Sequence, residues 1–364
     1  MMRVLVIQLR RLGDLLMVTP LLRQLHGAFP LAEVDLLCEP AGLPIMRLNP
    51  HLNELLTIPA HSTIVDLLDL ARQLRARRYD WVVDCQGLPK TALLARLSGA
   101  SVRVGFGGRW WRAPAYSHRY TRHDADYSAR DKLRLLARAL DAGAAPDLAD
   151  LDLDFLVGGE TRRQAENFCR AWFPGEACLP PARPGGPARW PMAALFGVSR
   201  QPYKIWPPER LAEIGRRLAE RGWRPFLVHG PGEEESARLV AALLEGALVD
   251  YPLPDLPVLK EILARCALFV GNDGGPKHLA ASAGVPTLAV FGRVHPEAWT
   301  RPDDTTQRWV ATASQSREIP TGGPCDPAST LSELPVEAVW RAVEALLKDS
   351  APLFRRSLQP GGRR

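Results

Sequence analysis

The sequence predicts an α/β protein made of two doubly wound domains, each built on a parallel sheet. Short apolar runs alternate with amphipathic stretches along the chain, which is typical of βα units. A Pro- and Gly-rich segment, PGEACLPPARPGGPARWP from Pro174, interrupts this alternation near the middle. The chain has 364 residues, 46% of them apolar, and a single hydrophobic core rarely grows to that size.

Buried strands are expected in the first half at RVLVIQ from Arg3, VDLLCE from Val34, ELLTIP from Glu54 and DWVVDCQ from Asp80. Helices are expected near Leu15, Ile64 and Thr91, where apolar residues recur every three or four positions, and a longer one from about Arg130 to Gly143. We assign residues 1–175 to an N-terminal domain and residues 176–191 to a linker.

The βα alternation resumes after the linker. Strands are expected at ALFGVS, RPFLVHG, ALFVGND and TLAVFG, with helices over residues 209–220, from Glu233, around Lys260, at Pro276 and, in the tail, at VEAVWRAVEALLK from Val336. Residues 192–348 therefore form the predicted C-terminal domain. Residues 349–364 are polar and rich in Arg, Pro and Gly, so we expect a disordered tail.

Charge and cysteine usage narrow the class of protein. A net charge of +6 and a pI near 9.1 suit a phosphorylated, polyanionic or membrane-surface partner without requiring one. The six cysteines include no C-x-x-C pair, which indicates reduced thiols rather than a zinc site or a disulfide framework. We read no signal peptide and no membrane-spanning run, and expect a cytoplasmic protein that could lie on a membrane surface.

The turn GNDGGPKH from Gly271 is the most informative motif. It follows a predicted strand and precedes a helix that opens at Pro276. Backbone N–H groups at a helix N-terminus lack internal partners, and the helix dipole adds positive charge there. The turn therefore predicts an anion site, framed by Asp273, Gly274, Gly275 and His278, that would suit a diphosphate.

Other candidate residues also follow predicted strands, because ligands bind outside the carboxyl ends of parallel strands. Asp14 could be a general base or only a helix cap, and one residue could do both. Lys204 could bind phosphate or be an ordinary solvated lysine. Glu233, near Gly232 in HGPGEEE, could hold a ribose or simply favour the helix start.

The segment RVGFGGRWWRAPAYSHRYTR from Arg103 interleaves cations with aromatic rings. We interpret it as a loop that binds an acidic, partly apolar acceptor, while a mobile solvated loop and a groove for single-stranded nucleic acid remain alternatives. Its basic residues are Arg109, Arg112, His118, Arg119 and Arg122, and no nucleic-acid partner is expected.

Several familiar motifs are missing from the sequence. There is no G-x-G-x-x-G after the first strand, no G-x-x-x-x-G-K-[ST] and no H-E-x-x-H. The acidic groups Asp124/Asp126 and Asp150/Asp152/Asp154 lie in loop-like sequence and are expected to be solvated. We therefore predict no metal.

Together these motifs resemble the heptosyltransferases of glycosyltransferase family nine, which extend the inner core of lipopolysaccharide. The resemblance runs from Arg3 to about Lys348. It is carried by LRRLGDLLMVTPLL, by RVGF with the later RDKLRLLARAL, and by GNDGGPKHLAASAGVPTLAVFG with the following HPEAW. It implies a GT-B fold, in which an acceptor domain and a donor domain face an interdomain cleft, with no metal and no cofactor.

The resemblance also implies roles for individual residues. Asp14 matches the catalytic base, Lys204 the lysine near the donor diphosphate and sugar, Asp273 the donor-sugar contact and His278 a residue of the phosphate-binding turn. Ser199 and Arg200 take the phosphate-contact positions, Glu233 or Glu234 would hold the ribose, and Arg11 joins the basic residues expected to contact the acceptor. The chain departs from the family pattern at Gly274, where Ser is common, at Lys277, where Met or Ser is common, and at Arg200, which replaces a hydroxyl residue; an extra cation at Lys277 would tighten diphosphate binding or alter donor choice.

The expected function is that of an inverting, metal-independent glycosyltransferase. It would move a heptose or similar sugar from ADP-heptose, or a related nucleotide sugar, to an anionic glycolipid at the inner membrane surface. The alternatives are a nucleotide-sugar epimerase or hydrolase of the same fold, and a non-catalytic nucleotide-sugar-binding module. The acceptor position and the oligomeric state are not specified by the sequence.

Overall fold

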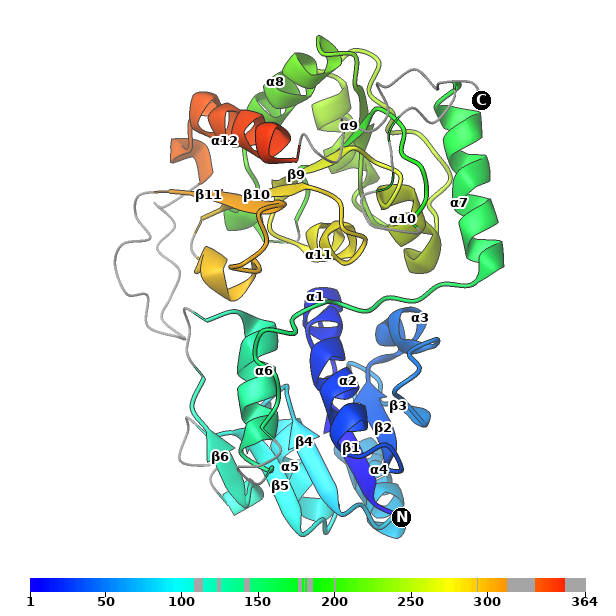
Figure 1. Ribbon diagram of the computed structural model, residues 1–364, viewed down its shortest axis with the longest axis vertical. Helices are drawn as coiled ribbons and strands as arrows, with labels where there is room; N and C mark the ends of the chain where they lie inside the picture. The colour runs from blue at the N-terminus through cyan, green and yellow to red at the C-terminus, as the bar shows by residue number, and fades with distance from the viewer. Residues whose placement is uncertain are drawn as a thin grey trace, which may run out of the picture. The chain divides into compact units, whose positions relative to one another are not determined.

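The computed structural model describes residues 1–107, 114–122, 126–140, 145–175, 179, 181, 186–199, 201–292, 294–312 and 331–350. The chain divides into two compact units, Met1–Leu156 and Val157–Arg364. Figure 1 shows the helices and strands of each unit.

A parallel sheet forms the centre of the first unit. Its strands lie in the order β3-β2-β1-β4-β5-β6, the strand order of a dinucleotide-binding doubly wound sheet. The strands are β1 (Arg3–Ile7), β2 (Glu33–Cys38), β3 (Glu54–Thr57), β4 (Trp81–Asp84), β5 (Val102–Phe106) and β6 (His118–Tyr120). The strands expected at Arg3, Val34, Glu54 and Asp80 are thus confirmed.

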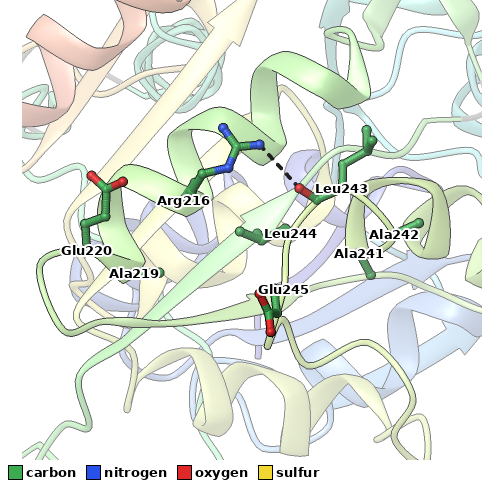
Figure 2. A pocket seen from close by; sticks show the side chains of 8 residues that line it. All are labelled: Arg216, Ala219, Glu220, Ala241, Ala242, Leu243, Leu244 and Glu245. Carbon is green, nitrogen blue, oxygen red and sulfur yellow. Dashed lines mark hydrogen bonds between the residues drawn. The ribbon is translucent and has the colours of Figure 1, made fainter.

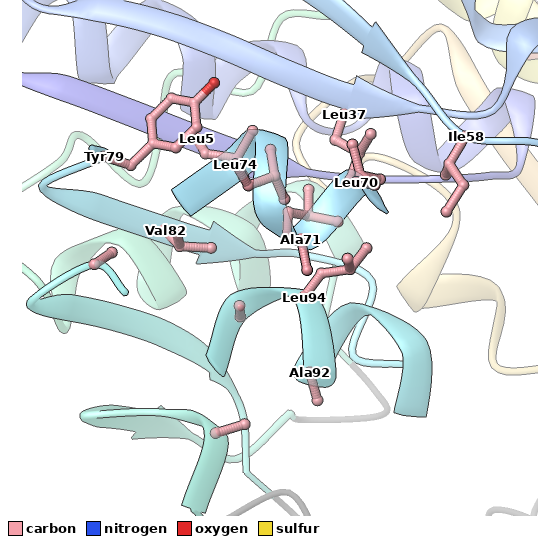
Figure 3. Close-up of a cluster of buried hydrophobic side chains, with 14 of the residues drawn as sticks. Leu5, Leu37, Ile58, Leu70, Ala71, Leu74, Tyr79, Val82, Ala92 and Leu94 are labelled. Atoms are coloured by element: carbon pink, nitrogen blue, oxygen red, sulfur yellow. The ribbon is translucent and has the colours of Figure 1, made fainter. Parts of the chain in front are cut away.

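The helices of the first unit connect these strands. They are α1 (Leu12–Leu16), α2 (Thr19–Ala28), α3 (Leu43–Met46), α4 (Ile64–Ala76), α5 (Pro89–Leu97) and α6 (Ser128–Ala137). On one face of the sheet, α4 and α5 bury an apolar cluster that includes Leu70, Leu74 and Leu94 against Leu5 and Val82 of the strands (Figure 3). Burial of such side chains contributes roughly 1.5–3 kcal/mol each, so this cluster fixes the strands whose ends carry the candidate residues.

The second unit repeats this architecture. Its parallel strands lie in the order β11-β10-β9-β7-β8 and comprise β7 (Met192–Phe196), β8 (Arg224–Leu227), β9 (Leu268–Asn272), β10 (Thr287–Phe291) and β11 (Gln307–Ala311). Its helices are α7 (Gly159–Trp172), α8 (Pro208–Ala219), α9 (Glu234–Ala241), α10 (Leu256–Leu263), α11 (Gly275–Ser282) and α12 (Val336–Asp349). Two doubly wound parallel sheets are the α/β architecture of GT-B proteins, as expected.

The tail helix α12 packs on α8 in the second unit. Arg221 stacks on the ring of Trp340 at 4.4 Å and pairs with Glu344 at 2.6 Å. The predicted amphipathic tail helix is confirmed, and the predicted disordered segment beyond Ser350 lies outside the described residues.

The boundary of the compact units differs from the predicted boundary at residue 175. Helix α7 belongs to the second unit because Phe168 packs edge-on against Phe226 and Tyr251, with ring centroids 6.0 and 5.6 Å apart. The predicted linker 176–191 therefore falls inside the second unit, where Leu179 and Arg189 form an antiparallel bridge.

Two further expectations for the first unit were wrong. Residues 118–120 form the edge strand β6 instead of a loop, and α6 ends at Ala137 instead of reaching Gly143. The carboxylates of Asp150 and Asp154, which were expected to be solvated, are 32% and 29% exposed and also bind the guanidinium of Arg23 on α2. These two carboxylates therefore hold the segment after α6 against α2.

Candidate functional site

The two sheets place the candidate residues at equivalent positions. In each sheet the strand order reverses beside the first strand, between β1 and β4 in one unit and between β7 and β9 in the other. Crevices at the carboxyl ends of such strands are where open α/β sheets bind ligands. Asp14 follows β1, whereas Lys204 follows β7 and Asp273 follows β9, so each unit carries candidate residues at its own reversal point.

The candidate residues of the second unit centre on an ion pair. Lys204 Nζ lies 2.8 Å from Asp273 Oδ2, and His278 Nε2 lies 4.0 Å from Asp273 Oδ1. A short helical turn, Pro202–Lys204, positions the lysine, and α11 begins directly after Asp273 and carries His278 in its first turn. Lys204 and Asp273 also line a narrow hollow at the carboxyl end of β10.

The cations around Asp273 keep it negatively charged. Burial alone would raise the pKa of Asp273, but Lys204, Lys277 and His278 together hold it below its usual range. Its Oδ1 atom is buried and has no hydrogen-bond partner among the described residues. A buried acceptor without a partner is costly, so this oxygen is suited to receive a hydroxyl of a bound ligand.

The loop after β8 supplies the predicted ribose contacts. Glu233 Oε2 accepts a hydrogen bond from Gly230 N at 2.8 Å, so this carboxylate closes its own loop. Gly232 has φ +79°, a left-handed conformation that disfavours side chains. The carboxylate of Glu234 is exposed, and hydrogen bonds from the backbone N–H groups of Glu234 and Gly232 lower its pKa. Residues 233 and 234 are both partly exposed.

The segment after β7 is only partly described. Ser199 Oγ accepts a hydrogen bond from Gln201 N at 3.1 Å and so stabilises the turn that leads to Lys204. The predicted phosphate contact Arg200 lies outside the described residues.

The first unit places Asp14 within the first turn of α1. The helix begins at Leu12, so Asp14 is its third residue and Gly13 also lies inside the helix. Arg11 is the N-cap residue, its side chain is exposed, and its backbone N lies 3.5 Å from Asp14 Oδ2. The side chain of Asp14 is 16% exposed, so it can cap the helix and still reach a ligand.

Lys132 is a site residue that the sequence did not reveal. Its ammonium is buried, 3.5 Å from Asp14 Oδ1, and donates to Ser128 Oγ at 2.8 Å. Burial lowers the pKa of Lys132, and the Asp14 carboxylate opposes that shift. The only signal in the sequence is its position four residues after Ser128 on the apolar side of α6, where a lysine is unusual.

The basic residues predicted to contact the acceptor differ in their surroundings. Arg119 is exposed on β6. Arg122 is 41% exposed but engaged, with its Nε 3.6 Å from Asp131 Oδ2 and its Nη2 donating to Ser128 Oγ at 2.9 Å. Arg109 and Arg112 lie outside the described residues. Arg122 thus belongs to the same polar cluster as Asp14 and Lys132.

Comparison with known proteins agrees with this arrangement. Residues 67–321 match the model of glycosyltransferase family 9 (heptosyltransferase). The chain belongs to this family. It is 26% identical to lipopolysaccharide heptosyltransferase 3 of Escherichia coli K12 over 95% of this chain and 98% of that protein. It is 30% identical to lipopolysaccharide heptosyltransferase 1 of Pseudomonas aeruginosa PAO1, covering 81% and 80% of the two chains.

Among solved structures, E. coli ADP-heptose LPS heptosyltransferase II superposes with a TM-score of 0.70 at 22% identity, covering 96% of this chain and all of the other. At that identity the likeness supports the GT-B fold of this glycosyltransferase. The family membership rests on the sequence match.

One departure from the family pattern has a packing reason in this glycosyltransferase. A Cβ atom at Gly274 would lie 2.7 Å from Cε1 of Phe196, the last residue of β7. Such a contact requires the ring to move. The Phe196 ring therefore disfavours any side chain at position 274.

The sequence predicted that Lys277 adds a positive charge to the anion site, but the structure buries this side chain. Its side chain is fully buried, and Nζ donates to Trp299 O at 2.6 Å and to Thr300 Oγ1 at 3.0 Å. The ammonium also lies 4.9 Å from the ring centre of Phe291. Lys277 therefore ties residues 299–300 to α11, and burial lowers its pKa to about 8 despite the nearby Asp273.

Buried Lys277 should make the stability of the enzyme depend on pH. Because its pKa is about 8 in the folded protein and 10.5 ordinarily, the unfolded chain binds more protons between these values, and stability rises with pH there. Relative to Lys277→Met, the wild-type free energy of unfolding should rise by up to about 3 kcal/mol from pH 7.5 to 10.5. Denaturant unfolding of wild type and Lys277→Met across this pH range measures the difference in free energy. Lys348→Met, which removes an exposed lysine of α12, should track wild type, and a pH-independent difference for Lys277→Met contradicts the assignment.

A hollow of about 680 Å³ lies elsewhere in the second unit. It is lined by Arg216, Glu220, Leu243, Leu244 and Glu245, and Arg216 Nη2 donates to Leu243 O at 3.4 Å (Figure 2). Here α8 ends just before β8 begins at Arg224, so the hollow lies at the amino edge of the sheet. Asp273 and Lys204 occupy the opposite, carboxyl edge, where the chemistry is expected.

The described residues contain neither a cluster of metal ligands nor a membrane-spanning helix. No group of three or more His, Cys, Asp or Glu side chains is arranged to hold a metal ion in this part of the chain. No helix in the described ranges is long and apolar enough to cross a membrane.

Proposed function

We propose that this family 9 glycosyltransferase transfers a heptose from ADP-heptose to the inner core of lipopolysaccharide, with inversion at the anomeric carbon. The carrying observation is the cluster of Lys204, Asp273 and His278 where α11 begins, at the reversal point of the second sheet. The printed names of its relatives, which are lipopolysaccharide heptosyltransferases and an ADP-heptose-dependent enzyme, supply the sugar and the acceptor.

The second unit would hold the donor. The backbone N–H groups of Gly274 and Gly275 and the start of α11 would bind the diphosphate, whereas Pro276 has no N–H to contribute. Lys204 would add a positive charge as the diphosphate departs. Asp273 Oδ1 would accept a sugar hydroxyl, and Glu234 or Glu233 would accept from the ribose. In this arrangement protein cations and dipoles neutralise the leaving group, and metal-independence remains a prediction.

The first unit would activate the acceptor. Asp14 would take the proton as the acceptor O–H bond breaks and its oxygen bonds to the anomeric carbon. The bond from that carbon to the diphosphate breaks at the same time, and its electron pair leaves with the nucleotide. The proposed contacts for anionic groups of the two substrates are arginines. Three of them are described, Arg11, Arg119 and Arg122, and three lie outside the described residues, Arg109, Arg112 and Arg200. The location at a membrane surface likewise remains a prediction.

Two linked measurements test this function. ADP-heptose at 100 times its Kd should stabilise the protein by about 2.7 kcal/mol, which raises Tm by several degrees, whereas UDP- and GDP-sugars should leave Tm unchanged. ADP release should then require a lipopolysaccharide acceptor that lacks the heptose. ADP release without acceptor would indicate a hydrolase, binding without any turnover would indicate a binding module, and an equal response to every nucleotide sugar would contradict the donor assignment.

A further inference from the structure

Asp14, the proposed general base, forms an ion pair with the buried side chain of Lys132. The side chain of Lys132 is 1% exposed, and its ammonium lies 3.5 Å from Asp14 Oδ1. A buried ammonium stays charged only beside a compensating anion or hydrogen-bond acceptors. Lys132 has both, since it also donates to Ser128 Oγ.

The neighbouring groups leave Asp14 as the anion that balances Lys132. Arg122, from the segment after β6, faces the lysine but is itself 3.6 Å from the buried Asp131 carboxylate on α6. Cys85, after β4, also faces Lys132, and burial raises the pKa of this thiol to about 12, so it is neutral. The charges near Lys132 therefore pair as Arg122 with Asp131 and Lys132 with Asp14.

We propose that Lys132 is a positioning residue that holds the Asp14 carboxylate in one orientation for proton abstraction. This inference rests on the proposed role of Asp14 as the general base. The hydrogen bond to Ser128 Oγ fixes the ammonium on α6, and the ammonium in turn attracts Asp14 Oδ1 at 3.5 Å. A general base must be held close to its productive geometry, so loss of this partner should cost turnover.

Steady-state kinetics of the full-length enzyme test this role. In Lys132→Met, kcat should fall about tenfold or more because the carboxylate is no longer fixed, whereas KM for the acceptor should change little. The Kd for ADP-heptose should stay unchanged, because the proposed donor residues belong to the other unit. Lys132→Arg keeps the charge and should restore most of kcat. Lys90→Met removes a lysine paired with Glu39 at 3.7 Å in the same unit and should behave like wild type.

A wild-type kcat in Lys132→Met would overturn the inference, and so would a loss of kcat that Lys132→Arg does not reverse. If Lys132→Met does not fold, Lys132→Gln replaces it, with the same two readings. A separate readout is the difference in Tm between wild type and Asp14→Asn. This difference should shrink as pH rises, because Lys132 then loses its proton and no longer needs an anion. A difference that does not depend on pH overturns the pairing. If Asp14→Asn keeps full turnover, the proposed function of Asp14 fails instead.

Discussion

Asp14→Asn should lower kcat by about 100- to 10,000-fold, the usual range for loss of a general base. Asparagine keeps an oxygen for the backbone N–H of Arg11 but cannot accept a proton from the acceptor hydroxyl. The Kd for ADP-heptose should not change, because the donor residues Lys204, Asp273 and His278 belong to the other unit. Single-turnover kinetics with the lipopolysaccharide acceptor, together with a donor titration, measures both quantities.

Asp66→Asn is the matched control. Asp66 occupies the same third position in α4 and accepts hydrogen bonds from Thr63 N at 2.7 Å and Thr63 Oγ1 at 2.8 Å. Loss of this cap should lower stability slightly and leave kcat unchanged. A comparable fall in kcat in both variants would assign Asp14 to helix capping, and near wild-type turnover of Asp14→Asn would remove it from the mechanism.

Most of the fold follows from local patterns in the sequence. The runs at Arg3, Val34 and Leu268 are buried strands because parallel strands covered on both faces need continuous apolar residues. The edge strand β6 could not be predicted, because it is only three residues long and none of them is buried. The domain boundary was also beyond local analysis, since α7 joins the second unit through long-range contacts, such as the packing of Phe168 on Tyr251 and the hydrogen bond from Arg265 Nη2 to Arg162 O.

The site was predictable only where a motif sits after a strand. Asp273 and His278 stand in a Gly-rich turn before a helix, and that pattern has a physical meaning without a structure. Lys132 is separated from Asp14 by more than a hundred positions, and no local rule connects them. Arg23, which binds Asp150 and Asp154, is equally distant from its partners. Long-range ion pairs of this kind appear only once the chain is folded.

Lys204→Ala should raise the Kd for ADP and for ADP-heptose by about 10- to 100-fold. A charge-assisted hydrogen bond to phosphate contributes roughly 1.5–3 kcal/mol, and each 1.4 kcal/mol is tenfold in affinity. The variant also leaves Asp273, which is 8% exposed, without its closest cation, so an uncompensated carboxylate would face the diphosphate. Lys204→Arg should recover part of the affinity because it restores the charge. Calorimetric titration at two salt concentrations measures the affinity and its electrostatic share.

Lys260→Ala separates a diphosphate contact from a general loss of an ion pair. Lys260 Nζ lies 2.8 Å from Glu261 Oε1 with 13% of its side chain exposed, close to the values of 2.8 Å and 19% for Lys204. It lies on α10, away from the turn at Asp273, so its loss should leave the nucleotide Kd unchanged. If Lys204→Ala titrates like wild type, the lysine does not bind the diphosphate. If both variants weaken binding equally, the effect comes from destabilising the second unit, because the one feature that distinguishes the two lysines is the anion site where α11 begins.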